Sequence, residues 1–380
     1  MKLVVILYVV GFAHLCSAQL ACDGIVSGTV NSDVSCTGEC VLDGATVNGN
    51  VFCSAGTLLA KGSSSITGNI QADGTVMDIE LDAVTVSGAV EIKNANSLNE
   101  VVIQQTATLT SLIINNTPAS VEVSGSLGTI EMTNGGNLVA DDLTTTGGIT
   151  VSGGDGIIEI CGSSIGGALS VTGQNGNINI NTNIANCDAT DLIGGVAIKL
   201  GTSVVTIRGA NLQNSDIGVL ENTGAVTLDQ LQVSDLNLEK SDGTLSISDV
   251  TTNSDLIIIE HTGDVLLSNL AIGGDANIKD VEGSVMLTDS NLNLEDISII
   301  LVSEDVTVNN NTNLNLTVEE NDGAVTISNS TINVASVNKN TGGVDITGNT
   351  ITTLSCSDNT PAPTGSGNTV GAPDGQCAIL

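Results

Sequence analysis

Acidic side chains recur in the turns of a repeated sequence pattern, at spacings that could place carboxylates beside one another. Ca²⁺ takes six to eight oxygen ligands, and in stacked turns two carboxylates about 5–10 Å apart can share one ion. The sequence therefore suggests an edge that binds Ca²⁺ weakly, and no other cofactor is indicated. The residues that would supply this edge are Asp242, Glu282, Glu304, Asp305 and Asp322. The competing interpretation is a solvated turn, because turns favour Asp and Asn for local hydrogen bonding.

The charge of the chain is strongly negative. Its 42 Asp and Glu residues stand against 8 Lys and Arg, which gives a formal net charge of −34 at pH 7. This excess argues against nucleic acid and anionic membrane surfaces as partners, since both attract a basic face. It is compatible with cations, mineral surfaces or basic protein partners. Solubility alone, with protection against edge-to-edge association, is the alternative reason for the acidity.

The start of the chain matches a secretory signal peptide over residues 1–18. Lys2 is followed by a short apolar run, and small residues precede Gln19. The apolar run is too short to span a membrane, and no later stretch is long enough. We therefore expect a secreted, extracellular protein, with a retained anchor as the alternative. Sequons for N-glycosylation stand at Asn115, Asn310, Asn315 and Asn329.

Eight cysteines follow the signal peptide, and an even number in a secreted chain indicates disulfides. Four crowd the start, two lie in the middle and two lie at the end. The pairs expected from this placement are Cys22–Cys40, Cys36–Cys53, Cys161–Cys187 and Cys356–Cys377. For the first four cysteines, the alternative connectivity is Cys22–Cys36 with Cys40–Cys53. A zinc site is disfavoured, because no histidine lies nearby and the Cys-x-x-Cys spacing is absent.

Residues that could carry catalysis do not form a recognisable set. Polysaccharide lyases need a basic residue, usually with neighbouring Lys or Arg, and after residue 18 the chain has one arginine, Arg208, and six scattered lysines. Glycoside hydrolases need two carboxylates at a defined separation, and a chain with so many acids contains chance pairs. His261, the one histidine after residue 18, occupies the turn position of Asn222, Ser241 and Asn321 in sister repeats, and we interpret it as an exposed turn residue. The sequence thus favours a non-catalytic protein and identifies no catalytic residue.

A repeat with a period of about 20 residues must position all of these side chains. One residue just before a short apolar strand, usually glycine, serves as the marker of each repeat. These markers recur at a nearly constant interval, at Gly224, Gly243, Gly263, Gly283, Glu304, Gly323 and Gly343. A short alternating apolar strand follows each marker, as in Val226/Leu228 and Val265/Leu267. This period with short strands is typical of a solenoid. We predict an all-β, single-domain parallel β-helix with coils of about 20 residues and disulfides that staple its ends.

An amide or acid stands six residues after each marker. The members of this column are Gln230, Asp249, Asn269, Asp289, Asn310, Asn329 and Asn349. Equivalent side chains in stacked coils lie above one another, so they can hydrogen-bond from coil to coil and stabilise a sharp turn. In this pattern the chain resembles the right-handed parallel β-helix, or pectin-lyase-like, superfamily, in which asparagine ladders recur at a turn. The resemblance implies the fold, and it carries no catalytic motif.

The chain divides, on sequence, into residues 1–18 (signal peptide), 19–75 (cysteine-rich N-terminal coils), 76–355 (β-helix body) and 356–380 (C-terminal cap and irregular tail). The expected function is that of a secreted, highly acidic structural or adhesive protein of an extracellular matrix, coat, mucus or mineralised tissue. A carbohydrate-active or carbohydrate-binding β-helix is the alternative.

Overall fold

The structure is a computed structural model, and it describes residues 19–104, 107–181, 187, 190–212 and 215–379. Strands make up 64% of the chain and helix 1%, in a parallel β-solenoid of about 17 turns, which confirms the predicted all-β solenoid. The predicted signal peptide, residues 1–18, lies outside the described residues. The chain forms two compact units that meet in sequence between Gly194 and Gly195.

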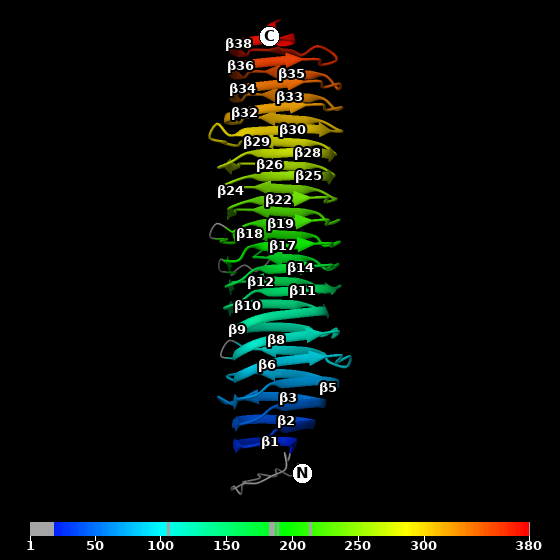
Figure 1. The fold of residues 1–380 in the computed structure, drawn as a ribbon, viewed down its shortest axis with the longest axis vertical. Helices are drawn as coiled ribbons and strands as arrows, with labels where there is room; N and C mark the ends of the chain where they lie inside the picture. Colours follow the sequence, from blue (N-terminus) through cyan, green and yellow to red (C-terminus); the bar gives the residue numbers. More distant parts are fainter. Residues whose placement is uncertain (1–18, 105–106, 182–186, 188–189, 213–214, 380) are drawn as a thin grey trace. The chain divides into compact units, whose positions relative to one another are not determined.

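The first unit ends at Gly194, and its strands appear from blue to green in Figure 1. Its strands are β1 (Leu20–Val30), β2 (Val34–Val47), β3 (Val51–Lys61), β4 (Ser65–Ile66), β5 (Ile70–Leu81), β6 (Thr85–Lys93), β7 (Glu100–Ile103), β8 (Thr108–Asn115), β9 (Ser120–Gly135), β10 (Leu138–Thr145), β11 (Ile149–Gly154), β12 (Ile158–Cys161), β13 (Ser164–Ile165), β14 (Leu169–Thr172), β15 (Ile178–Ile180) and β16 (Asp191–Leu192).

The second unit begins at Gly195 and contains the regular part of the repeat. Its elements are β17 (Val196–Lys199), β18 (Val205–Arg208), β19 (Ile217–Leu220), β20 (Val226–Asp229), β21 (Gln232–Val233), β22 (Leu236–Glu239), β23 (Leu245–Ser248), β24 (Thr251–Thr252), β25 (Leu256–Thr262), β26 (Val265–Ser268), β27 (Ala271–Ile272), β28 (Ala276–Glu282), β29 (Val285–Thr288), β30 (Asp296–Val302), β31 (Val306–Asn309), β32 (Thr312–Glu319), β33 (Val325–Ser328), β34 (Thr331–Asn338), β35 (Val344–Thr347), β36 (Thr350–Ser357), β37 (Thr364–Ser366), β38 (Thr369–Gly375) and the 3₁₀ helix η1 (Gln376–Ile379).

Each coil of the second unit contributes one strand to each of two long faces. One face stacks β20, β23, β26, β29, β31, β33 and β35 as parallel neighbours. The other stacks β19, β22, β25, β28, β30, β32, β34 and β36. The pairing of Val226 with Leu245, and of Leu245 with Val265, confirms the step predicted from the markers. Strands β5 and β36 run through the sequence boundaries expected near residues 75 and 355.

The core consists of apolar columns that run from coil to coil. One column of the second unit contains Val226, Leu245, Val265, Val285, Val306, Val325 and Val344, all of them buried. Strands alternate buried and accessible positions, so each four-residue strand sends two side chains inward. Each fully buried Val, Leu or Ile contributes about 1.5–3 kcal/mol relative to an exposed one. The stacking of like residues therefore fixes the alignment of one coil on the next.

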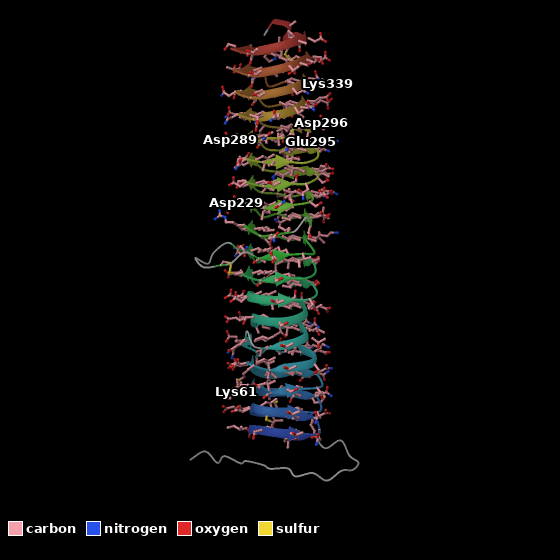
Figure 2. All side chains as sticks on the ribbon, turned by 90° about the vertical axis from the view of Figure 1, so that its left-hand side faces the viewer. Lys61, Asp229, Asp289, Glu295, Asp296 and Lys339 are labelled. Carbon is pink, nitrogen blue, oxygen red and sulfur yellow. A yellow bond between two sulfur atoms is a disulfide. The ribbon has the colours of Figure 1, made fainter. Side chains whose placement is uncertain are left out.

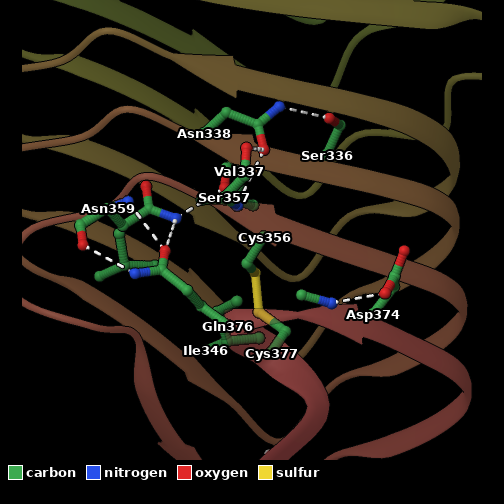
Figure 3. Close-up of a disulfide and its surroundings, with 12 residues drawn as sticks. Ser336, Val337, Asn338, Ile346, Cys356, Ser357, Asn359, Asp374, Gln376 and Cys377 are labelled. Carbon is green, nitrogen blue, oxygen red and sulfur yellow. Dashed lines mark hydrogen bonds between the residues drawn. A yellow bond between two sulfur atoms is a disulfide. The ribbon is translucent and has the colours of Figure 1, made fainter.

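Buried asparagines satisfy the backbone at one turn of the second unit. The Asn321 amide N–H donates to Oδ1 of Asn340 (3.2 Å), and the Asn340 amide donates to Oδ1 of Asn359 (3.0 Å). The side-chain amides of Asn321 and Asn340 donate along the same column, each over 2.8 Å. Gln376 ends this asparagine ladder, because its Oε1 accepts the Asn359 amide N–H over 2.8 Å (Figure 3).

The predicted amide-and-acid column lies one residue away from a second buried ladder. The buried ladder consists of the residues that directly follow column members. Ser290, Asn311 and Ser330 follow Asp289, Asn310 and Asn329, and they hydrogen-bond from coil to coil inside the turn. Asn349 is misassigned to the predicted column, since it accepts the amide N–H of Ser330 and so belongs to the buried ladder. The error arises because Val325 pairs with Val344, so the markers Gly323 and Gly343 do not occupy equivalent places in their coils.

The predicted column itself has a conformational purpose. Its residues from Gln230 to Asn329 all have φ between 50° and 56°, and Gly348 takes the place predicted for Asn349. This left-handed conformation favours Gly, Asn and Asp over other residues. Hydrogen bonds between column members, such as Asn310 Nδ2 to Asp289 Oδ1 (2.5 Å), are a secondary feature. The amide or acid recurs because every coil makes the same turn.

Three of the four expected disulfides are present. Cys22–Cys40 joins β1 to β2, Cys161–Cys187 closes a local loop, and Cys356–Cys377 ties η1 to β36 (Figure 3). The predicted Cys36–Cys53 disulfide is wrong, because both residues are free thiols buried in the core. They are direct partners in the β2–β3 pairing, and contact with the Cys36 thiol, together with burial, raises the pKa of the Cys53 thiol. The pair fills the core as two small apolar side chains.

Replacement of Asn340 by Ala tests the asparagine ladder. It removes the acceptor for two buried donors of Asn321, so we expect the local free energy of opening to fall by about 1–3 kcal/mol. Hydrogen exchange of peptides covering β32–β34 measures this opening. Asn277→Ala, at an exposed strand position, is the control and should change it by less than about 0.5 kcal/mol. Equal effects of the two replacements would contradict the ladder.

Differential alkylation tests the state of the cysteines. Cys36 and Cys53 should react with iodoacetamide after denaturation without reductant, because they are thiols, and not in the folded protein, because they are buried. The six disulfide-bonded cysteines should react only after reduction. Peptide mass spectrometry gives the readout, and a Cys36–Cys53 cross-linked peptide would contradict the structure.

Candidate cation-binding surface

An aspartate stands at the start of the same strand in five consecutive coils of the second unit. The members of this aspartate column are Asp216, Asp235, Asp255, Asp275 and Asp296. The first four immediately precede β19, β22, β25 and β28, and the fifth begins β30. All five are accessible to solvent. Their spacing along the chain follows the coil length, so each member lies next to the member in the adjacent coil.

Each of the first four aspartates accepts a backbone hydrogen bond from the next coil. The amide of Asp255 donates to Asp235 Oδ1 (3.1 Å), and that of Asp275 donates to Asp255 Oδ1 (3.0 Å). The same bond joins Asp235 to Asp216 over 3.3 Å and Asp296 to Asp275 over 3.4 Å. The column continues into Asn315, whose Nδ2 donates to Asp296 Oδ1 (2.9 Å). One oxygen of each of the first four carboxylates thus holds the turn, and Figure 2 labels Asp296, the last member of the column.

Hydrogen bonds favour the ionised form of Asp235, one member of the aspartate column. The hydroxyl of Ser254 and the backbone amide of Asp255 lower the pKa of Asp235 below its usual value. Ser284 likewise lowers the pKa of Asp264 in another column, through its hydroxyl and its amide. Adjacent coils lie about 4.8 Å apart, so neighbouring charges repel by about 1 kcal/mol in water. The aspartate column is therefore a row of charged groups at a fixed spacing.

The five acids proposed from sequence do not form one cluster. Asp242 pairs with Thr262, and Thr262 pairs with Glu282 in the following coil. By the same register Asp322 comes two coils after Glu282, with Ser303 between them. These three carboxylates therefore share a column but occupy alternate coils, about 10 Å apart.

Glu304 and Asp305 occupy two further columns. Glu304 takes the place of the turn glycines, since a side chain at Gly323 would meet its backbone. Asp305 accepts the Ala324 amide over 2.9 Å, as Asp264 accepts the Ser284 amide over 3.1 Å.

The acidic turn could be found from sequence, whereas the aspartate column was missed. The signal for the missed column was an aspartate directly before an alternating apolar strand in five successive repeats.

A shallow groove of about 420 Å³ follows the acidic turn from coil to coil. Its accessible rim carries carboxylates from two columns, and buried residues form its floor. The lining residues are Glu260, His261, Thr262, Asp280, Val281, Glu282, Leu301, Val302, Ser303, Glu320 and Asp322. His261, expected to be exposed, is only 2% exposed, because its side chain points into the coil in line with Ser241 and Val281. The groove is thus acidic at its rim and contains no lysine or arginine in its described lining.

Several basic groups are held in ion pairs, and Lys279 and Lys339 pair with Asp280 and Glu320, two carboxylates that line the groove. Arg208 Nε lies 2.8 Å from Asp229 Oδ2, and Arg208 does not line the groove. Lys339 Nζ lies 2.8 Å from Glu319 and 2.9 Å from Glu320, which together raise the pKa of Lys339 (Figure 2). Lys240 occupies the place of Glu260 in the preceding coil, so a lysine lies next to the first carboxylate of the groove rim.

The four sequons differ in accessibility. Asn310 and Asn329 are exposed, whereas Asn115 and Asn315 are partly buried. Asn315 also uses its Nδ2 in bonds to Leu294 O (2.8 Å) and Asp296 Oδ1 (2.9 Å). Asn310 and Asn329 are the more exposed residues, and their Nδ2 atoms also donate, to Asp289 Oδ1 (2.5 Å) and to Asn309 Oδ1 (3.2 Å).

Within the described residues, no three His, Cys, Asp or Glu side chains lie close enough together to hold one metal ion. The described part of the chain also contains no helix long and apolar enough to cross a membrane. Comparison with protein-family models, curated proteins and solved structures found no match to this chain. The structure thus defines the chain as a parallel β-solenoid, and the chemistry of its surface is the feature that bears on its role.

Two replacements of Asp255 separate its hydrogen bond from its charge. Asp255→Asn keeps an acceptor for the Asp275 amide and removes repulsion, so stability should be unchanged or rise by up to about 1 kcal/mol. Asp255→Ala leaves that amide without its acceptor and should lower stability by about 1 kcal/mol. Urea unfolding followed by far-UV circular dichroism gives the comparison. If Asn and Ala destabilise equally, the side-chain oxygen does not support the turn.

Proposed function

We propose that this chain is a secreted, non-catalytic structural or adhesive protein of an extracellular matrix, coat, mucus or mineralised tissue, and that its acidic surface binds Ca²⁺ weakly. The observation that carries the proposal is the aspartate column, Asp216 to Asp296, in five consecutive coils. Basic proteins, cations or a mineral surface are the partners that such a row of charge would attract.

The spacing of the aspartate column suits divalent calcium. Ca²⁺–oxygen distances are 2.3–2.6 Å, so one ion can span two oxygens separated by up to about 5 Å. Carboxylates in adjacent coils, about 4.8 Å apart, meet this limit, whereas those of Asp242, Glu282 and Asp322 in alternate coils exceed it. With two carboxylates for each ion, water supplies the remaining ligands. Binding should therefore be weak, in the range of about 0.1–1 mM that is typical of extracellular modules.

The charge of the column is not needed to hold the turn. In the first unit, asparagines make the same bond: Asn50 Oδ1 accepts the Asn69 amide, and Asn69 Oδ1 accepts the Ala89 amide, each over 2.9 Å. Asparagine would therefore serve in the second unit without the repulsion between neighbouring aspartates. The charge is therefore available for a role other than fold stability, and interaction with cations or basic partners would account for it.

An extracellular setting is consistent with the other features of the chain. The three disulfides suit an oxidising compartment. The exposed Asn310 and Asn329 would carry N-linked glycan in a secreted eukaryotic protein.

A calcium titration of the secreted protein at physiological salt tests the proposal. Binding to the folded state alone should raise stability by about 1.4 kcal/mol at ten times the dissociation constant, with a matching rise in melting temperature. Calorimetry should show heats in the millimolar range. Absence of both signals up to several millimolar Ca²⁺ would remove the calcium part of the proposal.

A charge-matched pair of triple variants locates the effect. Asp235→Asn, Asp255→Asn and Asp275→Asn together should abolish most of the calcium-dependent stabilisation. The control replaces Glu122, Glu131 and Glu159 by Gln, which removes the same charge from outward positions whose neighbours in adjacent strands are uncharged. If both variants lose the response equally, net charge and not the aspartate column attracts the ion.

A further inference from the structure

His261 occupies a buried ladder position and makes none of the bonds of its sister residues. The preceding coil has Ser241 at this position, and the following coil has Val281. Asn222, one coil before Ser241, donates through Nδ2 to Ser203 O (3.0 Å) and Gly224 O (2.8 Å). Neither ring nitrogen of His261 has a hydrogen-bond partner among the described residues, although the ring is 2% exposed.

An unpartnered buried imidazole destabilises the coil that contains it. A buried donor without a partner loses the hydrogen bond it had in water, which is why such groups are rare in folded proteins. Asn321, at the same position three coils later, shows that an amide fits: its Oδ1 accepts the Val302 amide over 2.9 Å. Residue 261 therefore has a side chain that weakens the column, and a titratable ring is what distinguishes it from asparagine.

The charged groups around the ring are few. Asp242, in the preceding coil, and Asp264, in the same coil, interact electrostatically with it. The following coil covers it with the apolar Val281, while Asp280 and Glu282 on either side of Val281 lie on the groove rim. Burial lowers the pKa of His261, and the nearby backbone of Gly243, Asp264 and Ser241, together with the carboxylate of Asp242, opposes this only in part.

We propose that His261 makes its coil in the second unit a weak point, meaning that protonation of the ring favours local opening of this coil. Above about pH 6.5 the neutral ring stays buried and the coil formed by β25 and β26 remains closed. At lower pH the opened chain takes up a proton that the closed coil resists, so acid favours opening at this coil. The groove rim, with Glu260 and Glu282 on adjacent coils, would separate at the same point. This inference does not depend on cation binding.

Hydrogen exchange at pH 7.5 and 5.5 tests the weak point in the full chain. After correction for intrinsic exchange rates, the opening constant of peptides covering β25 and β26 should rise at pH 5.5, by up to about tenfold, the limit set by an ordinary histidine pKa of about 6.5 in the open state. The carboxylates also respond to pH, so the quantity to compare is the ratio of wild type to His261→Asn. This ratio of opening constants should grow as the pH falls, by up to about tenfold, and a ratio that does not change would overturn the proposal.

Asn321→His is the reciprocal variant, because it places an imidazole at the same ladder position in another coil. Exchange around β32 and β33 should then acquire the same dependence on pH. If His261→Asn does not fold, a proton NMR titration of the wild-type ring decides the matter. A midpoint below about 6.5 is expected, and an ordinary midpoint without any change in exchange would also overturn the proposal.

Discussion

The alignment of each coil on the next is the constraint on which the rest of the structure depends. A solenoid coil contacts only its neighbours, so its backbone, its core and its turns must all be completed by the coils on either side. Apolar columns such as Val226, Leu245 and Val265 set this alignment, and the parallel strand pairs then follow. A side-chain oxygen at a turn can reach the amide of the adjacent coil only because that alignment is maintained. Both the asparagine ladder and the aspartate column are consequences of it.

The repeat could be predicted from sequence because its signals are local and recur. Glycine or a short polar residue marks the turn, two apolar residues mark the strand, and Asn or Asp marks the left-handed position. Cysteines at the ends of the chain similarly identified Cys22–Cys40 and Cys356–Cys377. The misplacement of Asn349 shows the limit of this approach. A shift of a single position along the chain moves a side chain from the outside of a turn to the inside.

The direction in which a side chain points was the information that sequence spacing did not provide. His261 was assigned to the correct turn position, yet an exposed and a buried residue at that position have the same spacing. Cys36 and Cys53 are adjacent as expected, and adjacency alone does not distinguish a disulfide from two packed thiols. The aspartate column was overlooked because turns commonly contain Asp, so no single member called for a further reason. Only the succession of bonds from Asp216 to Asp296 shows that the five act as one feature.

Solubility alone does not account for where the acids lie. A net charge of −34 would keep the chain soluble from any set of outward positions, and scattered glutamates such as Glu131 and Glu159 avoid repulsion between neighbours. The aspartate column instead places five charges about one coil apart, which is the least favourable arrangement for isolated carboxylates. An ion or a basic partner that spans adjacent coils reverses that balance, because it turns the repulsion into binding energy. The position of the charges, more than their number, therefore argues for a surface that meets cations.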